Sequence, residues 1–214
     1  LSGSVVGLFN GLVITKFKVP PFVATLAMLT IARGITMLWT KGFPISGLGE
    51  NFTWIGTGWF MGIPVPVWIS GIIVLIAILI TNRTKLGRYI YAIGGNESAA
   101  TLSGINVNKV KMLVYSIAGG LAAAGGILVT SRLDAAQPNA GTGYELDSIA
   151  AVVIGGTSLS GGKGSVGGTV LGAVIIGVLN NGLVLLNVSP FWQQVVKGGV
   201  ILLAVIIDKA KAKN

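Results

Sequence analysis

Residues 112–131 read MLVYSIAGGLAAAGGILVTS, an apolar run without a single charged side chain. Its length matches the roughly 20 apolar residues that a helix needs to cross a hydrocarbon layer of about 30 Å. Uncharged runs recur in residues 63–82 and, at greater length, in residues 164–196, and residues 20–40 are interrupted only by Arg33. These runs predict several membrane-spanning α-helices, because lipid offers no hydrogen-bond partner to an open backbone.

The composition of the whole chain also indicates a membrane protein. Of 214 residues, 52% are hydrophobic and 10% are charged, whereas a soluble domain carries about 25% charged residues. The apolar runs lack the alternation of β-barrel strands. We therefore expect residues 1–214 to form one all-α, polytopic transmembrane helix bundle. A short or broken helix is expected near residues 148–162, where an uncharged segment ends in Gly, Ser and Thr.

The positions of the basic residues predict the orientation in the membrane. The net charge is +9, but Lys and Arg lie between the apolar runs, which favours a topology signal over nucleic-acid binding. With the C-terminal tail in the cytoplasm, and residues 148–162 counted as a crossing, most basic residues fall on the cytoplasmic side. These are Lys16, Lys18, Arg83, Lys85, Arg88, Lys109, Lys111, Lys163, Lys209, Lys211 and Lys213. We expect a multi-pass protein of the cell (inner or plasma) membrane with a cytoplasmic C-terminus and no nucleic-acid partner.

The absence of Cys and His narrows the possible chemistry. It excludes thiolate nucleophiles, imidazole bases, disulfides and zinc sites with nitrogen or sulfur ligands. Residues 155–165, GGTSLSGGKGS, are not a phosphate-binding loop, because Gly164 stands where Ser or Thr must follow Lys163. We expect no catalytic residue, no metal and no cofactor.

Polar side chains inside or beside the apolar runs need separate interpretations. Arg33 and Lys197 either face a partner or a wet path, or extend to the membrane surface. Asn180 and Asn181 either tie helices together or line a polar route, because buried amides need hydrogen-bond partners. We interpret residues 132–147 as an exterior polar loop. Its acidic residues are read as solvated charges, with a cation site or partner docking as the alternatives; they are Asp134, Glu145 and Asp147.

Small residues recur on single helix faces and predict close helix packing. The sets are Gly3, Gly7 and Gly11; Ala118, Ala122 and Gly126; and Gly168 with Gly172.

Residues 94–107, GGNESAATLSGINV, predict a short helix within the long basic connection at residues 83–111. Asn96 can cap this helix, with Glu97 at its positive end, and Gly104 can end it. A helix of about two turns is marginal in water alone. We therefore predict that it docks into a groove on another protein at the cytoplasmic side.

Motifs along nearly the whole chain, in order, carry a family resemblance. They are PPFVATL at 20–26, YAIGGNE at 91–97, LSGINVNK at 102–109, AQP at 136–138, GTGYELD at 141–147, IAAVVIGGTSL at 149–159 and GGKG at 161–164. The chain resembles the ribose-type permeases of ABC importers. Members of that family carry further N-terminal helices, so this chain is expected to be the C-terminal portion of a longer permease.

The resemblance implies the membrane subunit of a sugar importer that works by alternating access. It implies a homodimer, an extracytoplasmic sugar-binding protein, a cytoplasmic ATP-hydrolysing subunit, and ribose or a related pentose as the transported monosaccharide. We assign ATPase coupling to Gly94, Gly95, Asn96, Glu97, Ala99, Ala100, Ser103 and Gly104. Binding-protein docking is assigned to Gln137, Tyr144, Glu145 and Asp147. The substrate pathway is assigned to Phe22, Thr25, Asn180 and Asn181.

Two other classes of function are weighed against this one. A stand-alone secondary transporter or channel for a small polar solute would need ionisable residues deep in the membrane, and only Arg33 and Lys197 qualify. A membrane-embedded enzyme without His or Cys would need paired carboxylates within the bundle, and no predicted span contains any.

Overall fold

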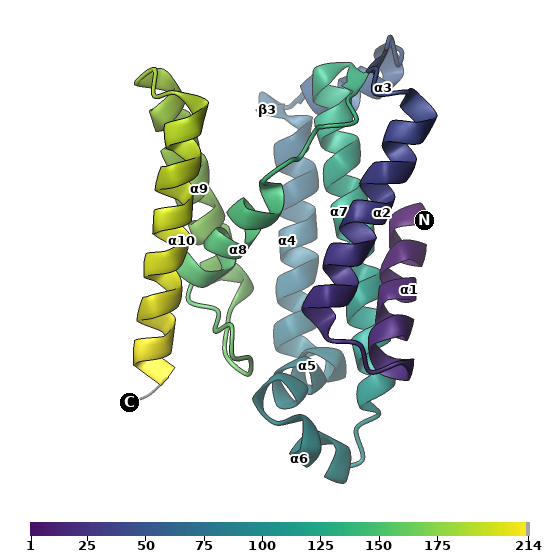
Figure 1. Ribbon diagram of the computed structural model, residues 1–214, viewed down its shortest axis with the longest axis vertical. Helices are drawn as coiled ribbons and strands as arrows, with labels where there is room; N and C mark the ends of the chain where they lie inside the picture. Colours follow the sequence, from purple (N-terminus) through teal and green to yellow (C-terminus); the bar gives the residue numbers. More distant parts are fainter. Residues whose placement is uncertain (213–214) are drawn as a thin grey trace. The chain divides into compact units, whose positions relative to one another are not determined.

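The computed structural model describes residues 1–212, and the last two residues of the predicted basic tail, Lys213 and Asn214, lie outside the described residues. The chain is predominantly α-helical, with four short strands among its described residues (Figure 1). The elements in chain order are α1 (Ser2–Lys16), α2 (Pro21–Thr40), β1 (Ile45–Ser46), α3 (Glu50–Thr57), β2 (Trp59–Phe60), β3 (Ile63–Pro64), α4 (Val65–Arg83), α5 (Lys85–Gly95), α6 (Glu97–Leu102), α7 (Val107–Leu133), β4 (Ala135–Ala136), α8 (Tyr144–Ile154), α9 (Val166–Leu185) and α10 (Pro190–Ala212).

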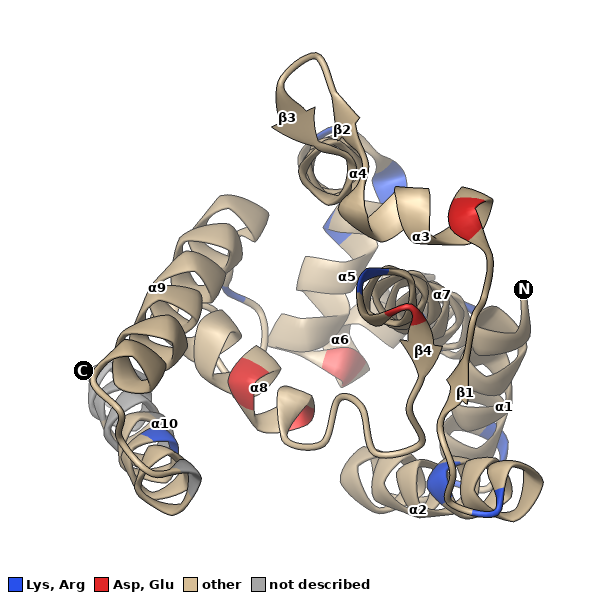
Figure 2. Cartoon of the chain, turned by 90° about the horizontal axis from the view of Figure 1, so that it is seen from above, with Lys and Arg blue, Asp and Glu red and all other residues tan. Residues whose placement is uncertain are grey.

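Four of the described helices are long and apolar enough to cross a membrane, namely α2, α4, α7 and α9. They confirm the predicted all-α, polytopic bundle. Charged positions are sparse along the helices, as Figure 2 shows. The helix α10 contains the last predicted crossing but is not among the four, so that crossing stays a prediction.

The chain divides into two compact units. Unit 1 comprises Leu1–Ile72 and Asn106–Gly141, and unit 2 comprises Ile73–Ile105 and Thr142–Asn214. The helix α4 therefore contributes its first part to unit 1 and its remainder to unit 2. The single transmembrane domain stays a prediction, and the two units are described separately.

In unit 1, α1 lies directly along α7, with glycines at the contact. A Cβ on Gly7 would lie 2.9 Å from the Tyr115 carbonyl carbon and closer still to its oxygen, and the Ser116 hydroxyl donates to the Ser4 carbonyl at 3.1 Å. Close packing through the face of Gly3, Gly7 and Gly11 is thus confirmed. The same prediction is wrong for Gly126, where a Cβ would meet no atom within 4 Å.

The end of α7 in unit 1 is held by short elements. The strands β1 and β4 pair antiparallel, and the Leu48 N–H donates to the Asp134 carboxylate at 3.2 Å. The helix α3 packs on α7, where the fully buried Ser131 hydroxyl donates to the Phe52 carbonyl. Asp134 is therefore a structural acceptor, and it stays exposed, which agrees with its interpretation as a solvated charge.

In unit 2, the short helix α8 packs against α9 through backbone contact. A Cβ on Gly172 would overlap the Ala151 carbonyl oxygen, and one on Gly168 would overlap the Gly155 carbonyl oxygen. Ala150, Ala151 and Ile176 form the buried cluster between the two helices. The predicted short helix is confirmed, but it begins at Tyr144, before the predicted segment. Glu145 and Asp147, which suggested a loop, lie in its first turn.

Candidate functional site

The predicted coupling segment folds as two successive short helices, α5 and α6. The Thr84 hydroxyl caps α5 by accepting from the Gly87 N–H at 3.3 Å. The Asn96 side-chain oxygen caps α6 by accepting from the Ala99 N–H at 2.9 Å. Gly104 follows α6 with φ +82°, a left-handed conformation typical of a helix terminus. The predicted helix, its cap and its terminator are confirmed.

The two sides of α6 differ in exposure. Ala100 is 4% exposed, whereas Leu102 is 90% exposed. The helix is therefore anchored to its own unit on one side and presents an apolar side chain on the other. Leu102 is absent from the predicted coupling residues. It follows Ala100 by two positions on the six-residue helix α6, and this spacing is compatible with a side chain that points away from unit 2 and could contact a partner.

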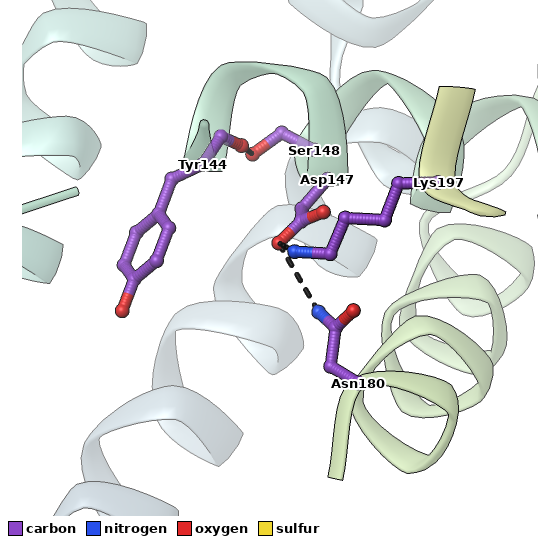
Figure 3. A network of polar contacts seen from close by, with 5 residues as sticks. All are labelled: Tyr144, Asp147, Ser148, Asn180 and Lys197. Carbon is purple, nitrogen blue, oxygen red and sulfur yellow. Dashed lines mark hydrogen bonds and ion pairs between the residues drawn. The ribbon is translucent and has the colours of Figure 1, made fainter. Parts of the chain in front are cut away.

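Unit 2 contains a polar cluster that joins α8, α9 and α10 (Figure 3). The Lys197 ammonium and the Asn180 amide both donate to the same Asp147 carboxylate oxygen, at 3.0 Å and 3.1 Å. The side chains of Lys197 and Asp147 are 26% and 18% exposed, so the ion pair is largely shielded from solvent. The other polar atom of Asn180, its side-chain oxygen, is buried and has no hydrogen-bond partner in the described part of the chain.

This cluster decides several interpretations of the sequence. Asp147 is not a solvated loop charge, because it lies in α8 and pairs with Lys197. Lys197 faces a partner, Asp147, which was one of the two alternatives for this lysine. Asn180 ties α9 to α8, which was one of the two alternatives for this amide. Asn181 is exposed and does not join the cluster. No group of three or more His, Cys, Asp or Glu among residues 1–212 is placed to hold a metal ion.

The residues predicted to dock a binding protein belong partly to unit 1 and partly to unit 2. Tyr144 and Glu145 are exposed on the first turn of α8 in unit 2. Gln137 is exposed in a turn of unit 1, where its carbonyl accepts from the Ala140 N–H at 3.1 Å. Asp147 points instead into the polar cluster.

Unit 1 contains an open groove of about 870 Å³ between α1, α2 and α7. Its size lies within the range of roughly 300–1,000 Å³ that is typical of small-molecule sites. Its polar lining residues include Asn10, Thr25, Arg33, Thr36 and Tyr115. Of the predicted pathway residues, Thr25 alone lines it. Phe22 is 71% exposed and is not part of the lining.

Comparison with known proteins supplies relatives along the whole chain. The profile of the family described as branched-chain amino acid transport system / permease component matches residues 1–205. Ribose import permease protein RbsC of Escherichia coli (strain K12) is 55% identical over 213 residues, which cover 98% of this chain and 66% of that protein. RbsC of Bacillus subtilis (strain 168) is 56% identical over 205 residues, covering 95% of this chain and 64% of that protein.

A relative named for another sugar is less similar. Galactose/methyl galactoside import permease protein MglC of Haemophilus influenzae is 41% identical over 216 residues, covering 98% of this chain and 64% of that protein. The chain thus spans about 66% of the length of the first ribose-named relatives. No solved structure matches it significantly.

Proposed function

The chain belongs to the family of branched-chain amino acid transport system permease components, and from this premise we propose that it is the permease subunit of an ATP-binding-cassette sugar importer. The proposed substrate is a monosaccharide, ribose or a related pentose. It is supported by the higher identity to relatives named ribose permeases, 55% against 41% for the galactose-named relative. A membrane transport component, rather than an enzyme, is what the family match indicates.

The observation that carries the proposal is the capped helix α6. It is too short to be stable alone, is fixed on its inner side through Ala100, and presents Leu102 outward. These properties suit docking into a groove of a separate cytoplasmic ATPase subunit, as an amphipathic helix does. The coupling surface then comprises the predicted residues Gly94, Gly95, Asn96, Glu97, Ala99, Ser103 and Gly104, with Leu102 as an added anchor. The predicted residue Ala100 is buried and supports α6 from its inner side.

The proposed assembly is a homodimer in the cell membrane with cytoplasmic C-termini. A sugar-binding protein delivers the monosaccharide from outside, docking through the exposed Tyr144, Glu145 and Gln137. Closure of the ATPase subunits pulls on α6 and switches the bundle between outward-open and inward-open states. Asp147 contributes by holding α8 in place rather than by direct docking.

The groove of unit 1 is the proposed route of the sugar through that unit. Thr25, Asn10 and Thr36 present polar groups along it, which suits the many hydroxyl groups of a monosaccharide. In unit 2, Asn180 is a pathway candidate because its side-chain oxygen has no hydrogen-bond partner among the described residues; a sugar hydroxyl could donate to this buried atom only after α8 and α9 move. Asn181 and Phe22 remain pathway candidates on sequence grounds.

Co-purification of the native complex tests the coupling surface. Replacing Glu97 and Ser103 together by Trp is expected to abolish retention of the ATPase subunit, because both positions lie on α6 or at its end. Asn108→Trp, at an exposed position outside α6, is the matched control and should retain the ATPase. Undiminished retention in the double variant contradicts the coupling assignment. Sugar uptake by permease vesicles without any ATPase supports the secondary-transporter alternative instead.

A threonine pair on α2 tests the groove. Thr25→Val removes a hydroxyl from the lining, and we expect the apparent sugar affinity to fall about 3- to 10-fold, the worth of one hydrogen bond. Thr30 is on the same helix, bonds to the Leu26 carbonyl at 2.7 Å and does not line the groove. Thr30→Val should leave the KM for uptake unchanged. Equal KM values for the two variants contradict the proposed route.

A further inference from the structure

The turn between α8 and α9 contacts α5 without intervening side chains, and this contact lies inside unit 2. A Cβ on Gly94 would lie 2.7 Å from the Gly162 backbone nitrogen, and one on Gly162 would lie 2.9 Å from the Gly95 Cα. The Tyr91 hydroxyl donates to the Gly164 carbonyl at 3.0 Å, which adds a hydrogen bond between α5 and the turn. The backbone of the coupling segment therefore touches the backbone of this turn directly.

The turn is built to hold one shape. Gly161 and Gly162 have φ of +89° and +74°, where other residues are strained. The Ser158 N–H donates to the Lys163 carbonyl at 3.0 Å, and the Gly161 N–H donates to the Ser158 carbonyl at 3.1 Å. Because these hydrogen bonds lie within the turn, we expect a force applied at Gly162 to move the whole turn as a rigid body.

The two helices that the turn joins, α8 and α9, are also packed rigidly against each other. The contact of α8 with α9 is backbone against backbone at Gly172 and Gly168, and packed interfaces of this kind shift between discrete arrangements rather than deform. An open pocket of about 330 Å³ lies beside the turn, with Thr81, Ile90 and Thr169 in its lining. The turn therefore has free space next to it into which it can be displaced.

From this geometry we infer that Tyr91, Gly94 and Gly162 are positioning residues of the transport cycle. They pass a movement of α5 and α6 through the 157–164 turn to α8 and α9. The inference rests on the proposed function, in which an ATPase moves α6. Along the chain, the coupling segment leads only to α4 and α7, so the glycine contact is its direct route to α8 and to the polar cluster of Asp147.

Two glycines of unit 2, each in the last turn of its helix, provide a matched test in the complete permease complex with its ATPase and sugar-binding protein, reconstituted in vesicles. Gly94→Ala forces the contact apart, whereas a Cβ on Gly182 would meet no atom within 4 Å. Both variants change helix propensity similarly, because each replaces Gly by Ala in the last turn of a helix. The sugar transported per ATP hydrolysed should fall roughly 10-fold in Gly94→Ala and stay unchanged in Gly182→Ala.

A second variant covers the case in which Gly94→Ala does not accumulate in the membrane. Tyr91→Phe keeps the ring but removes the bond to Gly164, and we expect sugar transported per ATP to fall about 3-fold with ATPase retention intact. Unchanged stoichiometry in Tyr91→Phe, or the same stoichiometry in Gly94→Ala and Gly182→Ala, overturns the inference. These results differ from failure of the proposed function, in which the unaltered complex itself shows no ATP-dependent uptake.

Discussion

Lys197→Met is expected to destabilise the packing of α8, α9 and α10 by about 2 kcal/mol, less than the roughly 3–5 kcal/mol that breaking a fully buried ion pair costs. The substitution removes the Lys197 donor and leaves the Asp147 carboxylate with the hydrogen bond from the Asn180 amide. The smaller value is expected because the side chains of Lys197 and Asp147 are 26% and 18% exposed and so are only partly desolvated. Thermal unfolding of the detergent-solubilised permease measures the difference.

A double-mutant cycle separates the ion pair from other effects of the substitution. Asp147→Asn combined with Lys197→Met removes both charges, so no ion is left unpaired, and the double variant should be more stable than Lys197→Met alone. The exchanged pair, Asp147→Lys with Lys197→Asp, should recover part of the loss. Strictly additive destabilisation in the double variant would contradict an interaction between the two side chains.

The sequence indicates one member of this ion pair, Lys197, but not its partner. A lysine inside an apolar run needs a partner, and the chain has only six acidic residues from which to choose. The partner was missed because Asp147 follows Gly141 and Gly143 and reads as part of a loop. Its helical position depends on α8 beginning at Tyr144, and boundaries are less evident in a sequence than the existence of a helix.

Features set by local sequence were predicted well. The long apolar runs became α2, α4, α7 and α9, and Asn96 caps α6 because its side chain reaches an N–H three residues on. The groove was not predicted beyond Thr25. Asn10 and Thr36 line it only because α1, α2 and α7 turn particular faces toward one another, and no local pattern specifies those rotations. The contact of Gly94 with Gly162 is non-local for the same reason.

Gly172→Ala is expected to destabilise the α8–α9 pair by about 3 kcal/mol, the upper part of the usual range for overpacking. The added Cβ would overlap the Ala151 carbonyl oxygen and lie 3.0 Å from the Gly155 nitrogen. Both neighbours are backbone atoms, so no rotamer change can relieve the overlap and α8 must move away from α9. Since Asp147 is on α8 and Asn180 on α9, the movement also lengthens their 3.1 Å hydrogen bond.

Gly177 is the control for this prediction, because it lies on the same helix and a Cβ there would meet no atom within 4 Å. Gly177→Ala should be neutral or stabilising by up to about 1 kcal/mol, the difference in helix propensity between the two residues. Thermal unfolding of the two variants, side by side in one detergent, measures the contrast. Unfolding of Gly172→Ala at the temperature of the unaltered protein would mean that α8 and α9 are further apart than this structure places them. In that case the backbone contact could not transmit movement from the 157–164 turn to both helices as one body.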